Sequence, residues 1–260
     1  MGWWQTWKSA RRSQLLQRRP IPEPLWRLTL ARYGFLERLD GDDRAELREL
    51  STLFLADKEF HGAGGLHVDD AMAVAIAAQA CLPVLRLGLE WYSGFKGIVV
   101  HADAVLAQRE FIDETGVVHE YEEELSGEAM EGGPVMLSWR DVEDAGESAD
   151  WGYNVVIHEF AHVLDMRDGA ADGVPPLPDR AARQRWLAIV EVEYSAFCAA
   201  VDEGIDTLLD PYGAESTGEF FAVAAESFFT TPQDMQAAHP ALYELLAHFF
   251  RHDPAGALHA

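Results

Sequence analysis

The amino-acid sequence predicts an α+β fold that is mainly helical and contains a small mixed β-sheet. Segments with helical spacing of apolar residues occupy both ends of the chain, whereas strand-like runs are confined to residues 97–139. Helices that are separated from strands in this way are typical of the α+β class. Because the segments between the predicted elements are short, we expect one domain over residues 23–255 and an N-terminal extension over residues 1–22.

The predicted N-terminal extension is basic and amphipathic. Three tryptophans and three arginines share residues 3–18, which predicts a short helix with an apolar and a charged side. Pro20, Pro22 and Pro24 end this helix, because proline cannot continue the helical hydrogen-bonding pattern.

The elements of the main domain follow from periodicity and from capping residues. Asp42 and Asp69 are typical N-cap residues and precede apolar runs. Gly132 and Gly133 predict a turn before the last strand. The expected elements are helices over 24–38, 42–57 and 68–82, strands over 97–101, 117–121 and 134–139, and helices over 150–166, 178–203, 217–229 and 238–251.

Composition argues against a nucleic-acid partner and against a membrane location. The 260 residues include 20 basic and 44 acidic side chains, so the formal charge of −24 repels a phosphate backbone. The most apolar stretch, residues 71–85, is too short to cross a bilayer of roughly 30 Å. No secretory signal is visible, and Cys81 and Cys198 are expected to be buried thiols. We therefore expect a soluble cytoplasmic protein.

The segment His158-Glu159-Phe160-Ala161-His162 carries the chemistry. Histidines four residues apart on a helix project from one face, one turn apart, and can hold one zinc ion. Glu159 follows the first histidine directly, so its carboxylate can act as general base toward a water that the zinc activates. The alternative is a pair of surface histidines beside a glutamate.

A catalytic zinc site needs a third protein ligand. The predicted helix over 217–229 carries Glu219 and Glu226, two turns apart on one face and surrounded by apolar residues. A carboxylate on a buried helix is costly unless it is paired or bound to a metal. Glu219 is the better candidate and Glu226 a supporting partner, although charge and burial alone leave their order open. Asp165 and Asn154 are candidates for orienting an imidazole or for hydrogen bonds at the ends of the helix.

The sequence around these residues resembles the Mlc titration factor A family of bacterial zinc peptidases. The resemblance rests on the run from Tyr153 to His162, on Gly173-Val174-Pro175, on residues 134–139 and on Glu219-Phe220-Phe221-Ala222-Val223, and it covers residues 24–255. The spacing from Tyr212 to Glu219 is similar to that in the catalytic domain of anthrax lethal factor.

The resemblance implies a zincin-like metallopeptidase domain with one zinc ion per chain. It implies that Glu219 is the third ligand beside His158 and His162, and that Tyr212 stabilises the developing oxyanion. It also implies aminopeptidase-like activity on a peptide or protein substrate and association with the glucose-regulon repressor Mlc.

Two other functions compete with a zinc peptidase. One is a regulatory protein that sequesters a transcription factor and holds zinc for structure alone. The other is a zinc hydrolase that acts on a non-peptide amide or ester. Glu159 and Tyr212 favour chemistry, because a structural zinc site needs no base. Residues 135–139 predict either a core strand or a sheet edge that pairs with an extended peptide.

Overall fold

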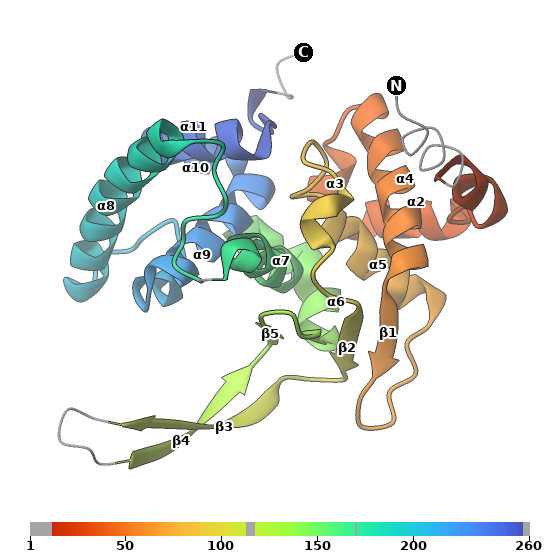
Figure 1. Cartoon of the computed structure of the whole chain (residues 1–260), viewed down its shortest axis with the longest axis horizontal. Coiled ribbons are helices and arrows are strands. Elements are labelled where there is room, and N and C mark those ends of the chain that lie inside the picture. The colour runs from red at the N-terminus through yellow and green to blue at the C-terminus, as the bar shows by residue number, and fades with distance from the viewer. Residues whose placement is uncertain (1–11, 113–117, 170, 257–260) are drawn as a thin grey trace.

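The computed structural model describes residues 12–112, 118–169 and 171–256 of the chain. It has the predicted mainly helical α+β fold with a small mixed sheet (Figure 1). Helices from the first third of the chain and from the last third form two groups, and α7 runs between them. The described helices are α2 (Glu23–Arg32), α3 (Gly34–Glu37), α4 (Gly41–Asp57), α5 (Asp70–Cys81), α6 (Trp139–Ser148), α7 (Val155–Asp165), α8 (Arg180–Asp202), α9 (Thr217–Thr230), α10 (Pro232–Ala238) and α11 (Pro240–Phe250), with 3-10 turns η1 (Leu89–Tyr92), η2 (Ala149–Trp151), η3 (Met166–Asp168) and η4 (Pro211–Ala214).

The main sheet has four strands in the order β1-β2-β6-β5. β1 (Glu59–Gly62), β2 (Gly97–His101) and β6 (Val135–Ser138) are parallel, and β5 (Gly127–Ala129) pairs antiparallel with β6. β5 therefore forms one outer edge of the sheet. Of the two alternatives for residues 135–139, the core strand is confirmed for Val135–Ser138 and the sheet edge is wrong, because β6 lies between β2 and β5.

A separate antiparallel ribbon joins β2 to β5. Its strands are β3 (Val105–Ile112) and β4 (Val118–Leu125), and their register pairs Val105 with Leu125. Figure 1 shows this ribbon extending away from the body of the molecule. The ribbon leads directly into β5, so its base lies at the sheet edge that borders the candidate site.

The core is one continuous apolar cluster with aromatic contacts between distant segments. Phe160 of α7 lies with its ring centroid 4.9 Å from Tyr92, 5.7 Å from Phe54 and 5.9 Å from Phe95, mostly in edge-to-face geometry. Such pairs stabilise a fold by about 0.5–1.5 kcal/mol each beyond the burial of their area. Phe160 therefore anchors α7 on the side away from its histidines.

The structure differs from the predicted elements in places where local signals are weak. β1, β3 and β5 were not expected, because they are short or lack alternation of apolar and polar residues. The predicted strand over 134–139 ends at Ser138, whose side chain accepts from the N–H of Asp141 and caps the unexpected helix α6. The helix expected over 150–166 begins only at Val155, and the one expected over 238–251 begins at Pro240.

The ends of the chain are only partly described. Residues 12–18 are helical, in line with the predicted N-terminal helix, and the remainder of that prediction lies outside the described residues. The helix expected over 24–38 is interrupted at Tyr33, which separates α2 from α3. Within the described part of the chain, we find no helix with the length and apolar character needed to span a bilayer.

Candidate metal centre

Helix α7 carries both histidines and is fixed at its start by Asn154. The Asn154 side chain accepts a hydrogen bond from the N–H of Ile157 at 2.9 Å, as an N-cap does. Ile157, Ala161 and Leu164 are fully buried, so the opposite face, with the two histidines, is turned toward α9. The predicted helical context of the motif is confirmed.

Three donor atoms from α7 and α9 converge on one point. The Nε2 atoms of His158 and His162 are 3.2 Å apart, and the Oε2 atom of Glu219 lies 3.1 Å from the first and 3.2 Å from the second. Two ligands on a tetrahedral zinc ion, with bonds of about 2.0–2.1 Å, stand roughly 3.3–3.4 Å apart. This triangle is the one group of three metal-ligating side chains found among the described residues.

Hydrogen bonds around His158 select the tautomer that a metal requires. The Nδ1 atom of His158 lies 2.8 Å from Oε1 of Glu226. Burial raises the pKa of Glu226 and the hydrogen bond with His158 lowers it, and the ionised carboxylate can only accept. Nδ1 therefore carries the proton, and in the neutral ring Nε2 presents a lone pair toward His162 and Glu219. A lone pair facing a carboxylate oxygen is unfavourable unless a cation lies between them.

Glu226 is itself held by the start of α7. Its second oxygen accepts from the backbone N–H of Asn154, and the Asn154 side-chain amide donates to Oε1 of Gln79 at 2.8 Å. Gln79, Asn154 and Glu226 are almost completely buried. This chain of hydrogen bonds links α5, α7 and α9 behind His158, as outer partners of metal-binding histidines commonly do.

The charges of the site favour a cation. Burial opposes protonation of His158, yet its hydrogen bonds to Glu219 and Glu226 raise its pKa well above the ordinary value. Burial would raise the pKa of Glu219, but hydrogen bonds with His158 and His162 lower it to about 2. A positive charge, whether a proton or a metal ion, is thus stabilised at this point.

Glu159 lies beside the triangle and packs against the sheet edge. A Cβ atom placed on Gly127 of β5 would stand 2.5 Å from Oε1 of Glu159, so the carboxylate packs directly against the glycine backbone. Burial raises the pKa of Glu159 to about 6, against the opposing effects of the two histidines and of a hydrogen bond with the backbone of Ala129. A carboxyl with this pKa can exchange a proton near neutral pH.

Tyr212 lies on η4 at the mouth of the site. Its ring centroid is 6.1 Å from that of His158, and its side chain is 40% exposed. Together with His158, Glu159 and Gly127 it lines a cavity of about 220 Å³. A hydrogen bond ties η4 to α8, because the Tyr194 hydroxyl donates to the Ala214 carbonyl at 2.9 Å.

The structure brings together the five residues singled out in the sequence: His158, Glu159, His162, Tyr212 and Glu219. Glu219 faces both Nε2 atoms, whereas Glu226 meets the far side of the His158 ring.

The two residues with open roles serve the ends of α7. Asn154 forms its N-cap. Asp165 accepts from the N–H of Gly173 at 2.7 Å, and its other oxygen is buried and has no hydrogen-bond partner among the described residues. Of the two roles considered for Asp165, the structure shows the hydrogen bond at the end of the helix.

Sequence reasoning missed two residues at the site. Gln79 was hidden because a single glutamine in an apolar helix has no signature, although a fully buried amide always needs partners. Gly127 was hidden because its importance depends on the close approach of β5 to α7.

Comparisons with known proteins identify the family of the chain. The family model described as glucose-regulated metallo-peptidase M90 matches residues 4–251. An uncharacterized protein of Synechocystis is 37% identical over 250 residues, which is 95% of this chain and 90% of the relative. Mlc titration factor A of Salmonella arizonae is 34% identical over 89% of this chain and 92% of the relative. Mlc titration factor A of an Enterobacter species is 33% identical over 84% of this chain and 83% of the relative. The chain belongs to the family of glucose-regulated metallo-peptidases M90.

Proposed function

We propose that the protein is a zinc-dependent peptidase with aminopeptidase-like activity. The observation that carries the proposal is the triangle of His158 Nε2, His162 Nε2 and Glu219 Oε2, with Glu159 beside it and a cavity in front. Two imidazoles and one carboxylate are a donor set that catalytic zinc uses, and the spacing of the three atoms fits a tetrahedral ion. Zinc in such a site supplies Lewis acidity, which lowers the pKa of a coordinated water and polarises the substrate carbonyl.

Each residue then has a separate task. His158 stays in the required tautomer because Glu226 holds its Nδ1 proton. The Glu159 carboxylate takes a proton from the attacking water and delivers it to the nitrogen of the leaving amine. The Tyr212 hydroxyl donates a hydrogen bond to the carbonyl oxygen as negative charge develops on it, so Tyr212→Phe should lower kcat by about 10²- to 10³-fold.

The surroundings of Glu159 support a peptide substrate. Glu159 interacts with the backbone of Ala129, and β5 is the outer strand of its sheet. An extended peptide that pairs with this edge would pass beside the base. The cavity of about 220 Å³ has room for few residues, which favours cleavage near the end of a peptide.

The test compares turnover of amino-acid p-nitroanilides and short peptides by the wild type and by Glu159→Gln, with the zinc content of both measured. We expect both proteins to hold one zinc ion and only the wild type to turn over. If both hold zinc and neither cleaves any substrate, the peptidase proposal is wrong. For the ligands, Glu219→Ala should lose zinc, whereas Glu226→Ala should keep it with weaker affinity.

A second candidate function is binding of a transcriptional repressor of the Mlc type, and the names of the relatives support it. The two functions can coexist in one protein. Calorimetric titration of a purified Mlc-type repressor into Glu159→Gln separates them, because this variant keeps the surface and lacks the base. Binding without turnover in the wild type would make repressor capture the main function.

A further inference from the structure

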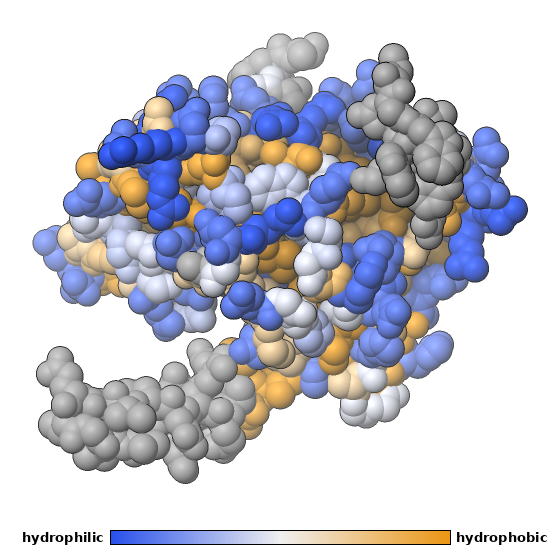
Figure 2. All heavy atoms as spheres, viewed as in Figure 1, coloured by the Kyte–Doolittle hydropathy of each residue, from blue (hydrophilic) through white to orange (hydrophobic). Residues whose placement is uncertain are grey.

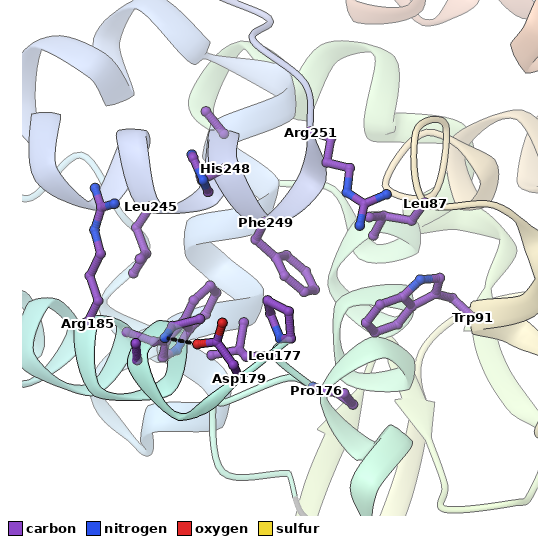
Figure 3. Close-up of a pocket in the computed structure, with 15 residues that line it drawn as sticks. Leu87, Trp91, Pro176, Leu177, Asp179, Arg185, Leu245, His248, Phe249 and Arg251 are labelled. Carbon is purple, nitrogen blue, oxygen red and sulfur yellow. Dashed lines mark hydrogen bonds between the residues drawn. The ribbon is translucent and has the colours of Figure 1, made fainter.

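A second cavity, of about 750 Å³, lies outside the candidate metal centre. It shares no lining residue with the cavity beside Tyr212. Its walls come from the segment after α5, from the segment before α8 together with the first turns of α8, and from the end of α11 (Figure 3). The volume is in the range of sites for small organic ligands, roughly 300–1,000 Å³.

The walls of this cavity are mainly apolar and held in place by ring contacts. Trp91 and Phe249 meet edge to face with centroids 5.7 Å apart, and Trp186 meets Phe249 at 5.5 Å. The Arg167 guanidinium lies over the Trp91 ring and donates to two backbone carbonyls of η1. Figure 2 shows several hydrophobic patches on the visible face, set among hydrophilic residues. The site is therefore preformed.

The charged side chains of the cavity include two guanidinium groups. Arg185, His248 and Arg251 line it, against the single carboxylate of Asp179. Asp179 is already used, because its side chain caps α8 by accepting from the N–H of Ala182 at 2.8 Å. Arg185 is also used, because it pairs with Glu244 at 3.2 Å, so the remaining guanidinium of the cavity is that of Arg251.

Arg251 is the charged residue of the cavity that is best placed to bind a ligand. It has φ 53°, and it is the one non-glycine residue with positive φ in the described part of the chain. At this position after a helix, glycine is the favoured residue, since any side chain adds strain. Figure 3 shows the Arg251 guanidinium extending toward Leu87, on the same side as Trp91. No ion pair of Arg251 is found among the described residues, whereas Arg185 pairs with Glu244 at 3.2 Å.

We propose that this cavity binds a small amphipathic anion, in which an aromatic or branched apolar body packs on Trp91 and Phe249 and an acidic group pairs with Arg251. A planar guanidinium holds a carboxylate, sulfonate or phosphate through two parallel hydrogen bonds. The inference does not depend on the peptidase activity, because none of its residues belongs to the candidate metal centre.

The test uses two fluorescent probes that differ in one charge. The sulfonate 1-anilinonaphthalene-8-sulfonate should bind the zinc-loaded wild type with one-to-one stoichiometry, and removal of zinc should leave its affinity unchanged. Arg251→Gly should weaken this binding about tenfold or more. The uncharged probe N-phenyl-1-naphthylamine should bind wild type and Arg251→Gly with affinities that agree within about twofold, since it lacks the acidic group.

Arg251→Gly also separates binding from folding. Glycine fits the left-handed backbone better than arginine, so the melting temperature of this variant should equal or exceed that of the wild type. Arg140→Gln, which removes an exposed guanidinium elsewhere, should bind both probes like the wild type. Absence of one-to-one binding, or equal affinity of the sulfonate for wild type and a folded Arg251→Gly, would overturn the proposal.

Discussion

Replacement of Glu226 by glutamine tests the hydrogen bonds behind His158 with almost no change in shape. Both oxygens of Glu226 now accept, one from Nδ1 of His158 at 2.8 Å and one from the backbone N–H of Asn154. A glutamine has only one accepting oxygen, and its amide nitrogen must face one of these two donors. Either the Asn154 N–H loses its partner, or the His158 proton must move to Nε2, where it blocks the metal.

The magnitude follows from the buried donor that this change leaves unpaired. An unsatisfied buried hydrogen-bonding group costs about 1–3 kcal/mol, which corresponds to about 5- to 150-fold in an equilibrium constant. Loss of an outer partner of a metal-binding histidine typically weakens the metal by about 10- to 100-fold. We therefore expect Glu226→Gln to bind zinc about 10- to 100-fold more weakly than the wild type.

Competition with a chromogenic chelator at pH 7.5 measures this zinc affinity. Glu191→Gln is the matched control, because it makes the same chemical change at an exposed position on α8 and should bind zinc like the wild type. If Glu226→Gln is folded and holds zinc as tightly as the control, Glu226 does not set the tautomer of His158, and the reasoning fails.

Three further predictions concern the neighbours of this site. Gly127→Ala should lower kcat by about 10²-fold and still bind zinc, because the new methyl group displaces Glu159. Gly94→Ala is the control, because a methyl group there meets open space and should leave kcat unchanged. Equal kcat values for the two variants would contradict the contact between Gly127 and Glu159. In the zinc-free protein, burial raises the pKa of Glu159 to about 6, and a bound zinc ion would lower this pKa. If Glu159 is the general base, kcat/KM should therefore rise with pH around a midpoint at or below about 6. A midpoint above 7 would contradict the assignment of Glu159 as the base. Burial also raises the pKa of Asp165 from the ordinary value of 3.8 to about 6, although the hydrogen bond from the N–H of Gly173 lowers it. Between these two pH values the folded state binds more protons than the unfolded state, so stability falls as the pH rises from 3.8 to 6. Relative to Asp165→Asn, the free energy of unfolding of the zinc-free wild type should therefore fall by up to about 3 kcal/mol between pH 4 and pH 7, measured by denaturant titration; parallel pH curves would show that Asp165 is not perturbed.

Much of the site was predictable because its signals are local. The spacing of His158 and His162 needs only helical geometry, and the apolar residues between them predict the buried side of α7. Capping is equally local. The Asp69 side chain accepts from the N–H of Met72, and α5 begins directly after this N-cap residue, as expected. Asp40 caps α4 in place of the expected Asp42, a shift of two residues among three neighbouring aspartates.

What could not be predicted depends on contacts between distant segments. Charge and burial alone leave the order of Glu219 and Glu226 open, and only the family resemblance selects Glu219; in the structure, the packing of α9 on α7 places Glu219 against both Nε2 atoms. β1 is recognisable only when β2 lies beside it, since four residues carry no periodicity. For the same reason Gln79 could not be linked to Asn154, which is 75 positions away in the chain.

The convergence of α7 and α9 also has a thermodynamic consequence. His162 and Glu219 are 57 residues apart in sequence, so a metal ion held by both would act as a cross-link that closes a long loop. Binding to the folded state alone adds about 4 kcal/mol to the free energy of unfolding when free zinc is about a thousand times its dissociation constant. Resistance of the protein to unfolding and to proteolysis would then rise and fall with the supply of zinc in the cell.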